Sequence, residues 1–543
     1  MRVIKTSLWV AAMFVAGGAV AAPPIIVTQG NGSAAACAGC HGLDGSGDAE
    51  QGAAVLAQLP RAYFIKQLND FKSGARSHPV MTSIAEALNA EEIAAAAEYY
   101  SGLPRPKVAV AASPESMASD NRTRGETLAR NGSWGNGSEN RQIPACFKCH
   151  GESGQGVPPA FPPIAGQHAA YTVNQLQAWK TGARSNDPQM LMKTLAEKLT
   201  DEEIQAVAEY LASAGTAAPT LGTTAQSNNK TGAPIKNEGD TKKSAPLPFV
   251  PPAESTIPKN EFGEMVVMGK NIFVNTQHYA KAFVGNGLNC TNCHLDNGRK
   301  ADSAPLWAAY VLYPAYRKKT GQVDTIQSRI QGCFRYSMDG KPPALDSKEM
   351  TALVTYHYWL ASGAPTGVKL AGQGFVKVPM PQKPDLSRGA EVYKNNCAIC
   401  HGENGQGTLA QGTGGNGKYA FPPLWGKDSF NWGAGMHRVD TAAGFIKANM
   451  PYGRGGSLSD QEAWDVALFM NSHERPRDPR FKGNLARTRD KEHDEVCLYG
   501  RTPDDLMKLL DKQAAAKPAS SKAADTLQQN KASTQGYSPA LAH

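Results

Sequence analysis

The sequence of 543 residues predicts an all-α protein made of four small helical domains in two halves, which a flexible linker joins. A Cys-x-x-Cys-His pentapeptide occurs four times along the chain, and apolar residues recur at helical spacing after these motifs. A stretch rich in Thr, Ala, Asn, Lys and Pro, without apolar periodicity, divides the chain near its middle. A chain of this length suits several domains of about 100 residues each.

The N-terminus predicts export. Arg2 and Lys5 form a basic start, an apolar run follows, and residues 19–21 (Ala-Val-Ala) offer a cleavage site. The apolar run is too short for a membrane span, and no later stretch reaches the roughly 18 apolar residues needed. We therefore expect a soluble, periplasmic protein. The predicted parts are a signal peptide (1–22), domains at 23–110, 111–215, 257–375 and 376–475, a linker (216–256) and a partly disordered extension (476–543).

The four pentapeptides predict covalently attached haem. Two cysteines that bracket two residues can each form a thioether with a haem vinyl group, and the adjacent histidine then lies under the iron. Four such motifs predict four haem c groups, each in a class I cytochrome c-type domain. The attachment residues are Cys37, Cys40, Cys146, Cys149, Cys290, Cys293, Cys397 and Cys400, and the proximal ligands are His41, His150, His294 and His401.

Each iron needs a sixth ligand or an open site, and methionines recur where such a ligand is expected. In the first two domains a Gly-Ala-Arg turn precedes the methionine. Met81 and Met192 each lie twelve residues before an isoleucine of the final helix, which favours Met192 over its neighbour Met190. Met450 serves the fourth domain. A single Met more often fills a gap in a core, but His/Met ligation raises the haem potential and suits electron transfer.

The third domain departs from this pattern. It lacks a Met-Pro segment, and Cys333 stands about where the other domains place their ligand. We expect a Cys333 thiolate on this iron, with Met338 as the rival ligand. A thiolate lowers the haem potential, and nearby arginines keep it ionised and bind oxyanions. The residues around it are Arg317, Arg329, Arg335 and Ser337. The site predicts a sulfur-bearing oxyanion as substrate, although a solvated basic face is the simpler interpretation of the arginines.

The net charge, the tenth cysteine and two Phe-Pro-Pro runs allow smaller inferences. The formal charge of +8 is modest, and without a dense basic run or nucleic-acid motif it indicates only a bias toward anionic partners. Cys497, in the extension, is expected to be a free or buried thiol. The Phe-Pro-Pro runs at 161–163 and 421–423 either accept the proximal imidazole N–H on a prolyl carbonyl or form simple rigid turns.

Two resemblances extend this interpretation. The N-terminal half resembles the dihaem cytochrome c4 family in its repeated haem motif, its Gly-Ala-Arg turn and its placed methionine. Residues 257–475 resemble thiosulfate dehydrogenases through the segment RIQGCFRYSMDG (residues 329–340), which lies about forty residues after a haem motif and before a His/Met domain. The whole chain resembles a fusion of that enzyme behind its dihaem electron acceptor.

The thiosulfate dehydrogenase resemblance implies an oxidoreductase that couples two thiosulfates to tetrathionate with release of two electrons, a reaction that many members also run in reverse. It implies that Cys333 is the distal ligand and catalytic thiolate. Arg329 and Ser337 match substrate-contacting positions, and Arg317 is a weaker match. Electrons would pass from the third haem to the fourth, then to the N-terminal haems and a downstream redox protein or oxidase.

Some members of that family place Lys directly before the fourth-domain methionine and switch ligands there. This chain has Asn449 at that position, so we expect constant ligation by His401 and Met450. Two other interpretations stay open. One is a thiosulfate-to-cysteine transferase of sulfur oxidation, which needs a carrier protein. The other is a non-catalytic four-haem electron carrier with Met338 rather than Cys333 on the iron.

Overall fold

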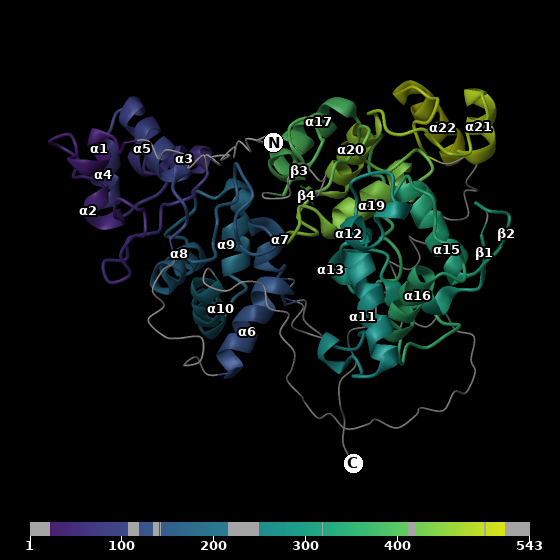
Figure 1. Ribbon diagram of the computed structural model, residues 1–543. Coiled ribbons are helices and arrows are strands. Elements are labelled where there is room, and N and C mark those ends of the chain that lie inside the picture. The colour runs from purple at the N-terminus through teal and green to yellow at the C-terminus, as the bar shows by residue number, and fades with distance from the viewer. Residues whose placement is uncertain are drawn as a thin grey trace, which may run out of the picture. The chain divides into compact units, whose positions relative to one another are not determined.

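A computed structural model describes the chain over residues 22–106, 119–133, 141, 143–214, 249–317, 319–410, 419–493 and 496–515. The predicted signal peptide, most of the linker and residues 516–543 lie outside these ranges. The described residues form helices joined by loops, with two short antiparallel hairpins (Figure 1). They belong to two compact units, residues 1–130 with 149–219 and residues 131–148 with 220–543. None of the described helices is both long and apolar enough to cross a membrane.

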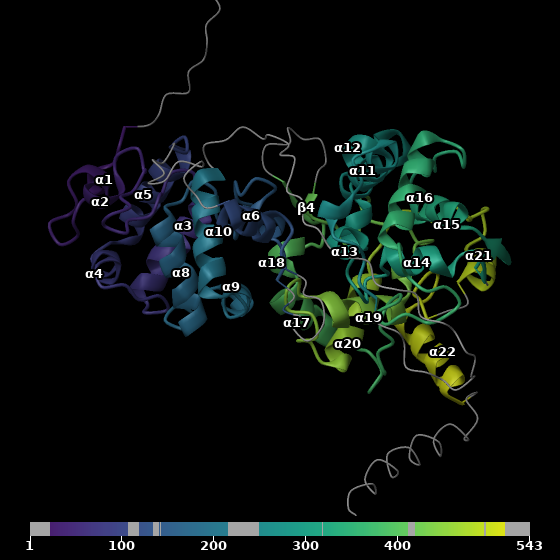
Figure 2. The same ribbon diagram turned by 90° about the horizontal axis from the view of Figure 1, so that it is seen from below.

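The first unit holds the helices of two similar repeats. They are α1 (Ile25–Thr28), α2 (Ala38–His41), α3 (Arg61–Lys72), α4 (Met81–Glu86), α5 (Ala90–Gly102), α6 (Ser119–Arg130), α8 (Ala169–Thr181), η1 (Pro188–Met190), α9 (Leu191–Ala196) and α10 (Asp201–Ala214). Helix α7 (Cys146–His150) crosses the boundary between the units. A capping box starts α5, where Asn89 accepts from the Glu92 amide and Glu92 accepts from the Asn89 amide. Helices α8 and α10 lie side by side (Figure 2).

The arginines of the repeated Gly-Ala-Arg turns join the two repeats. Arg76 donates hydrogen bonds to Gln67 Oε1 (2.8 Å) and Gln175 Oε1 (2.7 Å). Arg184 donates to Gln175 Oε1 (2.6 Å) and Gln67 Oε1 (2.9 Å). The two turns also pair with each other as an antiparallel bridge, and both arginines are buried. The sequence repeat thus becomes an interface with the same residues on both sides, as in a two-fold symmetric contact.

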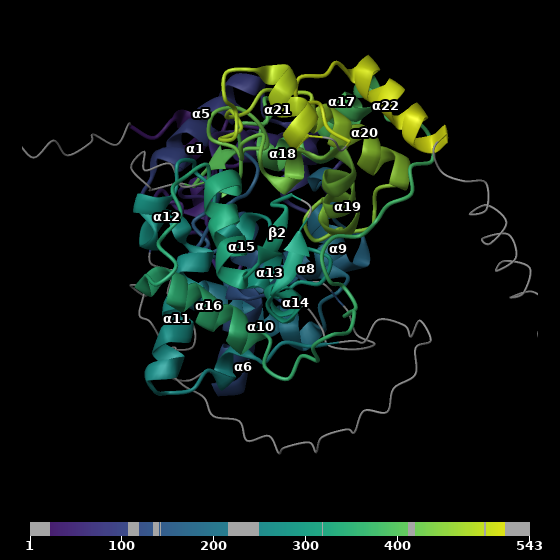
Figure 3. The same ribbon diagram turned by 90° about the vertical axis from the view of Figure 1, so that its right-hand side faces the viewer.

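The second unit begins with the third domain. Its elements are η2 (Glu254–Thr256), α11 (Glu261–Val274), α12 (Thr276–Tyr279), η3 (Lys281–Phe283), η4 (Cys290–Asn292), α13 (Leu295–Gly298), α14 (Leu306–Leu312), β1 (Ala315–Arg317), β2 (Gln322–Asp324), α15 (Ile326–Gly332), a π-helical turn η5 (Cys333–Ser337) and α16 (Lys348–Leu360). Figure 3 shows α16 lying beside α11. Leu353, Tyr356 and Leu360 of α16 are buried in the core of this domain, as their helical spacing predicts.

The fourth domain and the extension complete the unit. Their elements are α17 (Leu386–Asn396), α18 (Ala398–His401), β3 (Thr408–Leu409), β4 (Tyr419–Phe421), η6 (Gly435–His437), α19 (Val439–Asn449), α20 (Asp460–Asn471), α21 (Leu485–Glu492) and α22 (Pro503–Ala515). The described residues after 475 pack against this domain. Cys497, Leu498, Tyr499, Leu506 and Leu510 are all buried in its core. The sequence analysis missed this packing because the extension is dominated by charged residues.

Three of the domains repeat one helix crossing. A Cβ placed on Gly125, Gly269 or Gly389 would lie 2.2, 2.0 or 2.2 Å from a backbone carbonyl oxygen of the facing helix. These glycines bring α6 against α10, α11 against α16 and α17 against α20. Any side chain there would force the helices apart, because real Cβ atoms do not approach oxygen so closely. The common crossing gives each domain the same frame around its haem motif.

Candidate active site

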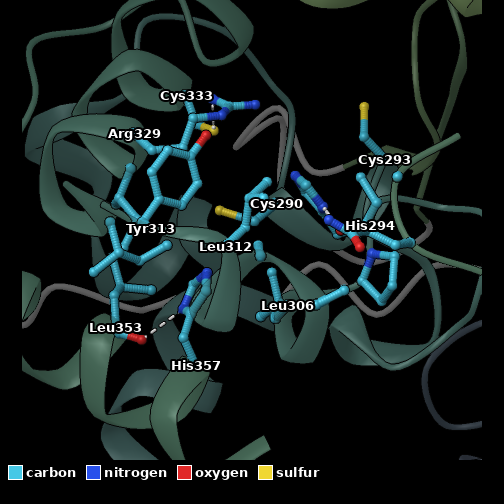
Figure 4. A pocket seen from close by; sticks show the side chains of 18 of the residues that line it. Cys290, Cys293, His294, Leu306, Leu312, Tyr313, Arg329, Cys333, Leu353 and His357 are labelled. Atoms are coloured by element: carbon cyan, nitrogen blue, oxygen red, sulfur yellow. Dashed lines mark hydrogen bonds between the residues drawn. The ribbon is translucent and has the colours of Figure 1, made fainter. Parts of the chain in front are cut away.

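The third domain contains a cavity of about 740 Å³ (Figure 4). Cys290, Cys293 and His294 line it from η4 and the turn after it, and Arg329 and Cys333 line it from α15 and η5. Figure 4 shows the last two residues at one side of the view and Cys293 with His294 at the other. The structure therefore brings together the haem attachment motif and the lone cysteine, which the sequence separates by about forty residues.

The histidines of all four motifs are oriented in the same way. In each, Nδ1 donates to a backbone carbonyl, which leaves the lone pair on Nε2 for a metal. The pairs are His41 with Ala54 O (2.9 Å), His150 with Pro162 O (2.7 Å), His294 with Ala304 O (2.7 Å) and His401 with Pro422 O (2.8 Å). Of the two interpretations of the Phe-Pro-Pro runs, the structure supports the prolyl carbonyl acceptor.

The residues present in the third domain fit a covalently attached haem. Two thiols that can form thioethers stand beside an imidazole whose Nε2 carries a lone pair. The walls are mainly apolar, with Leu306, Phe334 and Leu353 among them. A second possible ligand, the Cys333 sulfur, lines the same cavity and lies close to His294. This donor set matches an iron porphyrin with one nitrogen and one sulfur ligand.

Cys333 lies directly after the C-terminal end of α15. Thr325 and Ser328 form a capping box that starts the helix, and the chain then widens into the π-helical turn η5, which Cys333 opens. A π-helical turn changes the direction of the side chains that follow and is frequent at functional sites. Arg329 precedes Cys333 by four residues, so both lie on one face of the helix. Arg329 Nη1 donates to Cys333 Sγ over 2.9 Å.

The charges around Cys333 favour its thiolate. Burial alone would raise the pKa of this thiol, but the Arg329 charge above all, with the nearby His294 and Arg317, lowers it to about 6. Cys333 in turn stabilises the charged form of Arg329, because the Cys333 charge is the main cause that raises the pKa of Arg329. The cavity thus holds a thiolate and a guanidinium in direct contact.

Two residues of the cavity escaped the sequence analysis. Tyr313 lies in the aromatic run between α14 and β1, and its hydroxyl hydrogen-bonds Arg329. His357 lies on α16, and its Nδ1 donates to Leu353 O over 2.7 Å. Burial lowers the His357 pKa to about 4, so this ring is neutral. Their only sequence signals were the density of aromatic residues near Tyr313 and a lone histidine on an apolar helix, and neither singles out a site.

The other predicted residues of this site have different positions. Ser337 and Met338 both line the cavity, and Met338 is also part of the buried core. Arg317 is not among the described lining residues. Its Nη1 lies 3.9 Å from Asp324 Oδ2 across the β1–β2 hairpin, so its influence on Cys333 is through charge.

The methionines of the remaining domains differ in exposure. Met81 starts α4 and packs against the core of the first domain, and Met450 packs against the core of the fourth. Met190 is 50% exposed, whereas Met192 is half-buried in α9. This contrast agrees with the preference for Met192, and ligation by these three methionines stays a prediction.

Asn449 links the third and fourth domains. It precedes Met450, is buried, and donates from Nδ2 to Asp302 O and to Phe445 O, both over 3.0 Å. Asp302 lies two residues before Ala304, whose carbonyl holds His294. The residue beside the predicted distal ligand of the fourth domain is therefore tied to the loop that orients His294, the predicted proximal ligand of the third domain.

Comparisons with known proteins find similarity over most of the chain. Residues 276–366 match the family model described as SoxA/TsdA, cytochrome c domain, and residues 124–215 and 386–474 match the cytochrome c model. Over 260 residues the chain is 57% identical to the thiosulfate dehydrogenase of Stutzerimonas stutzeri (strain A1501), covering 47% of this chain and 83% of that protein. The chain belongs to the thiosulfate dehydrogenase family.

Two further similarities concern the rest of the chain. The thiosulfate dehydrogenase electron acceptor of the same organism is 46% identical over 192 residues, which are 35% of this chain and 85% of that protein. A solved structure of thiosulfate dehydrogenase (TsdBA) from Marichromatium purpuratum, in its "as isolated" form, is 43% identical, covers 88% of this chain and 96% of its own, and has a TM-score of 0.75. The predicted family, the cytochrome c-type fold and the oxidoreductase class are thereby confirmed.

Proposed function

We propose that the third domain oxidises two thiosulfates to one tetrathionate and two electrons, in a reaction that also runs in reverse. The observation that carries the proposal is the contact of 2.9 Å between Arg329 Nη1 and Cys333 Sγ inside a cavity that also holds a haem attachment motif. Cys290 and Cys293 would attach the haem, and His294 and Cys333 would ligate it. When bound, the haem supplies an acceptor for the electrons that sulfur oxidation releases.

The charges of the site suit a sulfur dianion. Arg329 can hold a sulfonate group through two N–H donors, with Tyr313 and Ser337 as further hydrogen-bonding groups in the cavity. Lys319 adds to this positive region, where burial and the neighbouring Arg480, Arg329 and Arg317 charges lower its pKa to about 8. Several cations near one cavity raise the local concentration of an anionic substrate.

The reaction at Cys333 has two steps. First, the Cys333 thiolate bonds to the sulfane sulfur of one thiosulfate, giving a cysteine S-thiosulfonate and releasing two electrons. Second, another thiosulfate attacks the sulfane sulfur and displaces the Cys333 thiolate, in the manner of thiol–disulfide exchange. No further electrons move in the second step, and its charges balance at three negative on each side. Arg329 stabilises the thiolate both before the first step and as the leaving group of the second.

We infer four haem c groups, one for each motif. Met81, Met192 and Met450 would complete His/Met sites, whose higher potentials suit electron transfer. The electrons would leave through the fourth domain and the N-terminal acceptor domains to a downstream redox protein or oxidase. The predicted signal sequence supports a periplasmic location.

Replacement of Cys333 by Gly tests the proposal. Turnover of thiosulfate with an artificial acceptor, and formation of tetrathionate, should vanish while the haem content stays at four per chain. A low-temperature EPR spectrum of the oxidised wild type should show a low-spin signal typical of thiolate ligation, which the variant loses. Retained turnover would overturn the mechanism. Activity that requires a carrier protein and forms no tetrathionate would indicate the transferase instead.

A further inference from the structure

A second cluster of metal-ligating side chains lies in the fourth domain, in residues that the proposed reaction does not use. It consists of His437 from η6, with His493 and Cys497 from the extension, and all three side chains are buried. Their ligand atoms lie within 4.8 Å of one another. It is the one group of three such residues found in the part of the chain that the structure describes.

Hydrogen bonds define which nitrogen of each ring carries a proton. His437 Nδ1 contacts Ala434 O, and a carbonyl oxygen can only accept, so Nδ1 carries the proton and Nε2 the lone pair. His493 Nε2 contacts a carboxylate oxygen of Asp478 over 2.8 Å, and that carboxylate also pairs with Arg480 at 2.6 Å. His493 Nε2 therefore donates, and in the neutral ring its Nδ1 carries a lone pair.

These two lone pairs point toward each other. His437 Nε2 and His493 Nδ1 are 3.2 Å apart, so in the neutral rings both lone pairs face the same space. Cys497 Sγ lies 3.7 Å from the same His493 Nδ1. A cation between these atoms would be bound by two nitrogen lone pairs and a sulfur, whereas without it one of the rings must carry a second proton.

The spacing of the three atoms suits a metal ion. Bond lengths of about 2.0–2.1 Å to nitrogen and about 2.3 Å to sulfur place tetrahedral ligand atoms roughly 3.3 Å apart for two nitrogens and roughly 3.6 Å apart for nitrogen and sulfur. Two of the observed separations are 3.2 and 3.7 Å, and the third, between His437 and Cys497, is within 4.8 Å. Each imidazole also has the outer partner that metal-bound histidines usually have, a carboxylate for His493 and a backbone carbonyl for His437.

The neighbourhood favours the thiolate form of the third ligand. Arg501 Nη1 lies 3.6 Å from Cys497 Sγ, and Arg501 Nη2 donates to His493 O over 2.8 Å. A guanidinium beside a thiol stabilises the deprotonated sulfur that a metal requires. The sequence separation between His437 and His493 is 56 residues, so a shared ion would join the extension to the start of α19.

We propose that His437 Nε2, His493 Nδ1 and Cys497 Sγ bind one borderline-soft transition-metal ion, zinc or copper. Two imidazoles and a thiolate are ligands that both ions accept. The ion joins the C-terminal extension to the fourth domain and is separate from the haem irons. This assigns a chemical role to Cys497, which the sequence analysis expected to be a free or buried thiol.

Elemental analysis of the intact haem protein tests the site. Protein from cells supplied with zinc and copper sulfate, purified without chelators, should contain about one equivalent of zinc or copper per chain beside the haem iron. X-ray absorption at the edge of the metal found distinguishes the two ions from each other and from iron. For zinc it should show nitrogen at about 2.0–2.1 Å and sulfur at about 2.3 Å.

Substitutions then separate ligation from packing. Cys497→Ser and His493→Gln should lose the metal while keeping the haem iron. Tyr499→Phe is the matched control, because its ring stacks on His493 at 4.1 Å and this substitution removes only a hydroxyl; its metal content should equal that of the wild type. If a ligand variant does not fold, Asp478→Asn still tests the site, with an expected affinity loss of about 10- to 100-fold in chelator competition. Wild-type protein that contains haem iron and takes up neither zinc nor copper would overturn the proposal.

Discussion

Arg329 and Cys333 form a direct guanidinium–thiolate pair, with Nη1 of the first 2.9 Å from Sγ of the second. They lie four residues apart on adjoining helical turns, so the local backbone alone brings them together. The pair combines a sulfur nucleophile with a group that binds sulfonates, and the predictions below follow from it and from the contacts around it.

Replacement of Arg329 by Gln should lower kcat/KM for thiosulfate by about 10- to 100-fold, since hydrogen bonds to charged groups contribute about 1.5–3 kcal/mol each. Steady-state kinetics with an artificial acceptor measures this. Arg335→Gln is the control, because the Arg335 side chain is exposed and lies only two positions beyond Cys333. Equal losses in the two variants would show that charge near the site, and not the contact with Cys333, is responsible.

The pH dependence of kcat/KM should reveal the thiolate. Arg329 helps to hold the Cys333 pKa at about 6, against an ordinary value near 9, so the reactive thiolate is lost only as the pH falls through about 6. Ligation of the proposed haem iron by Cys333 would lower this limit further. In Arg329→Gln the pKa rises because a positive neighbour is gone, and the acid limb of the profile should move to higher pH. An unchanged limb would contradict the assignment of this limb to Cys333.

Tyr313→Phe should reduce kcat/KM by about 2- to 10-fold, because one neutral hydrogen bond contributes about 0.5–1.5 kcal/mol. The hydroxyl that is removed helps to orient Arg329. Tyr316→Phe serves as the comparison, since Tyr316 is 69% exposed on β1 and should behave like the wild type. A loss of turnover as large as that of Arg329→Gln would instead indicate that Tyr313 contacts the substrate.

Asn449→Ala should destabilise the second unit by about 1–3 kcal/mol, because it leaves the half-buried Asp302 carbonyl without this donor. Chemical unfolding of the full chain measures the loss. Ser457→Ala offers a reference on an exposed loop of the same domain. If both variants unfold alike, the contact between the third and fourth domains contributes nothing measurable.

Arg76→Ala should cost the first unit about 2–4 kcal/mol, since Gln67 and Gln175 lose a charged donor in a buried interface. Arg61→Ala is the control: Arg61 pairs with Glu98 on the surface, and exposed ion pairs contribute about 0–1 kcal/mol. Calorimetry of the intact protein should separate the two variants. Equally small losses of stability in the two variants would show that Arg76 does not stabilise the interface between the repeats.

The sequence by itself determined the helical domain type and the family and predicted the haem attachment sites, because the five residues of a Cys-x-x-Cys-His motif are contiguous. It also determined the neighbourhood of Cys333, since Arg329 and Ser337 lie within one or two turns of it. Contacts between distant segments were decided only by the tertiary structure. Packing placed Tyr313 and His357 in the cavity and kept Arg317 out of its lining. It likewise folded a charged extension onto the fourth domain and brought His437 to His493 and Cys497 across 56 residues. Periodicity and spacing along the sequence do not predict these contacts, because the contacts depend on how whole helices pack against one another.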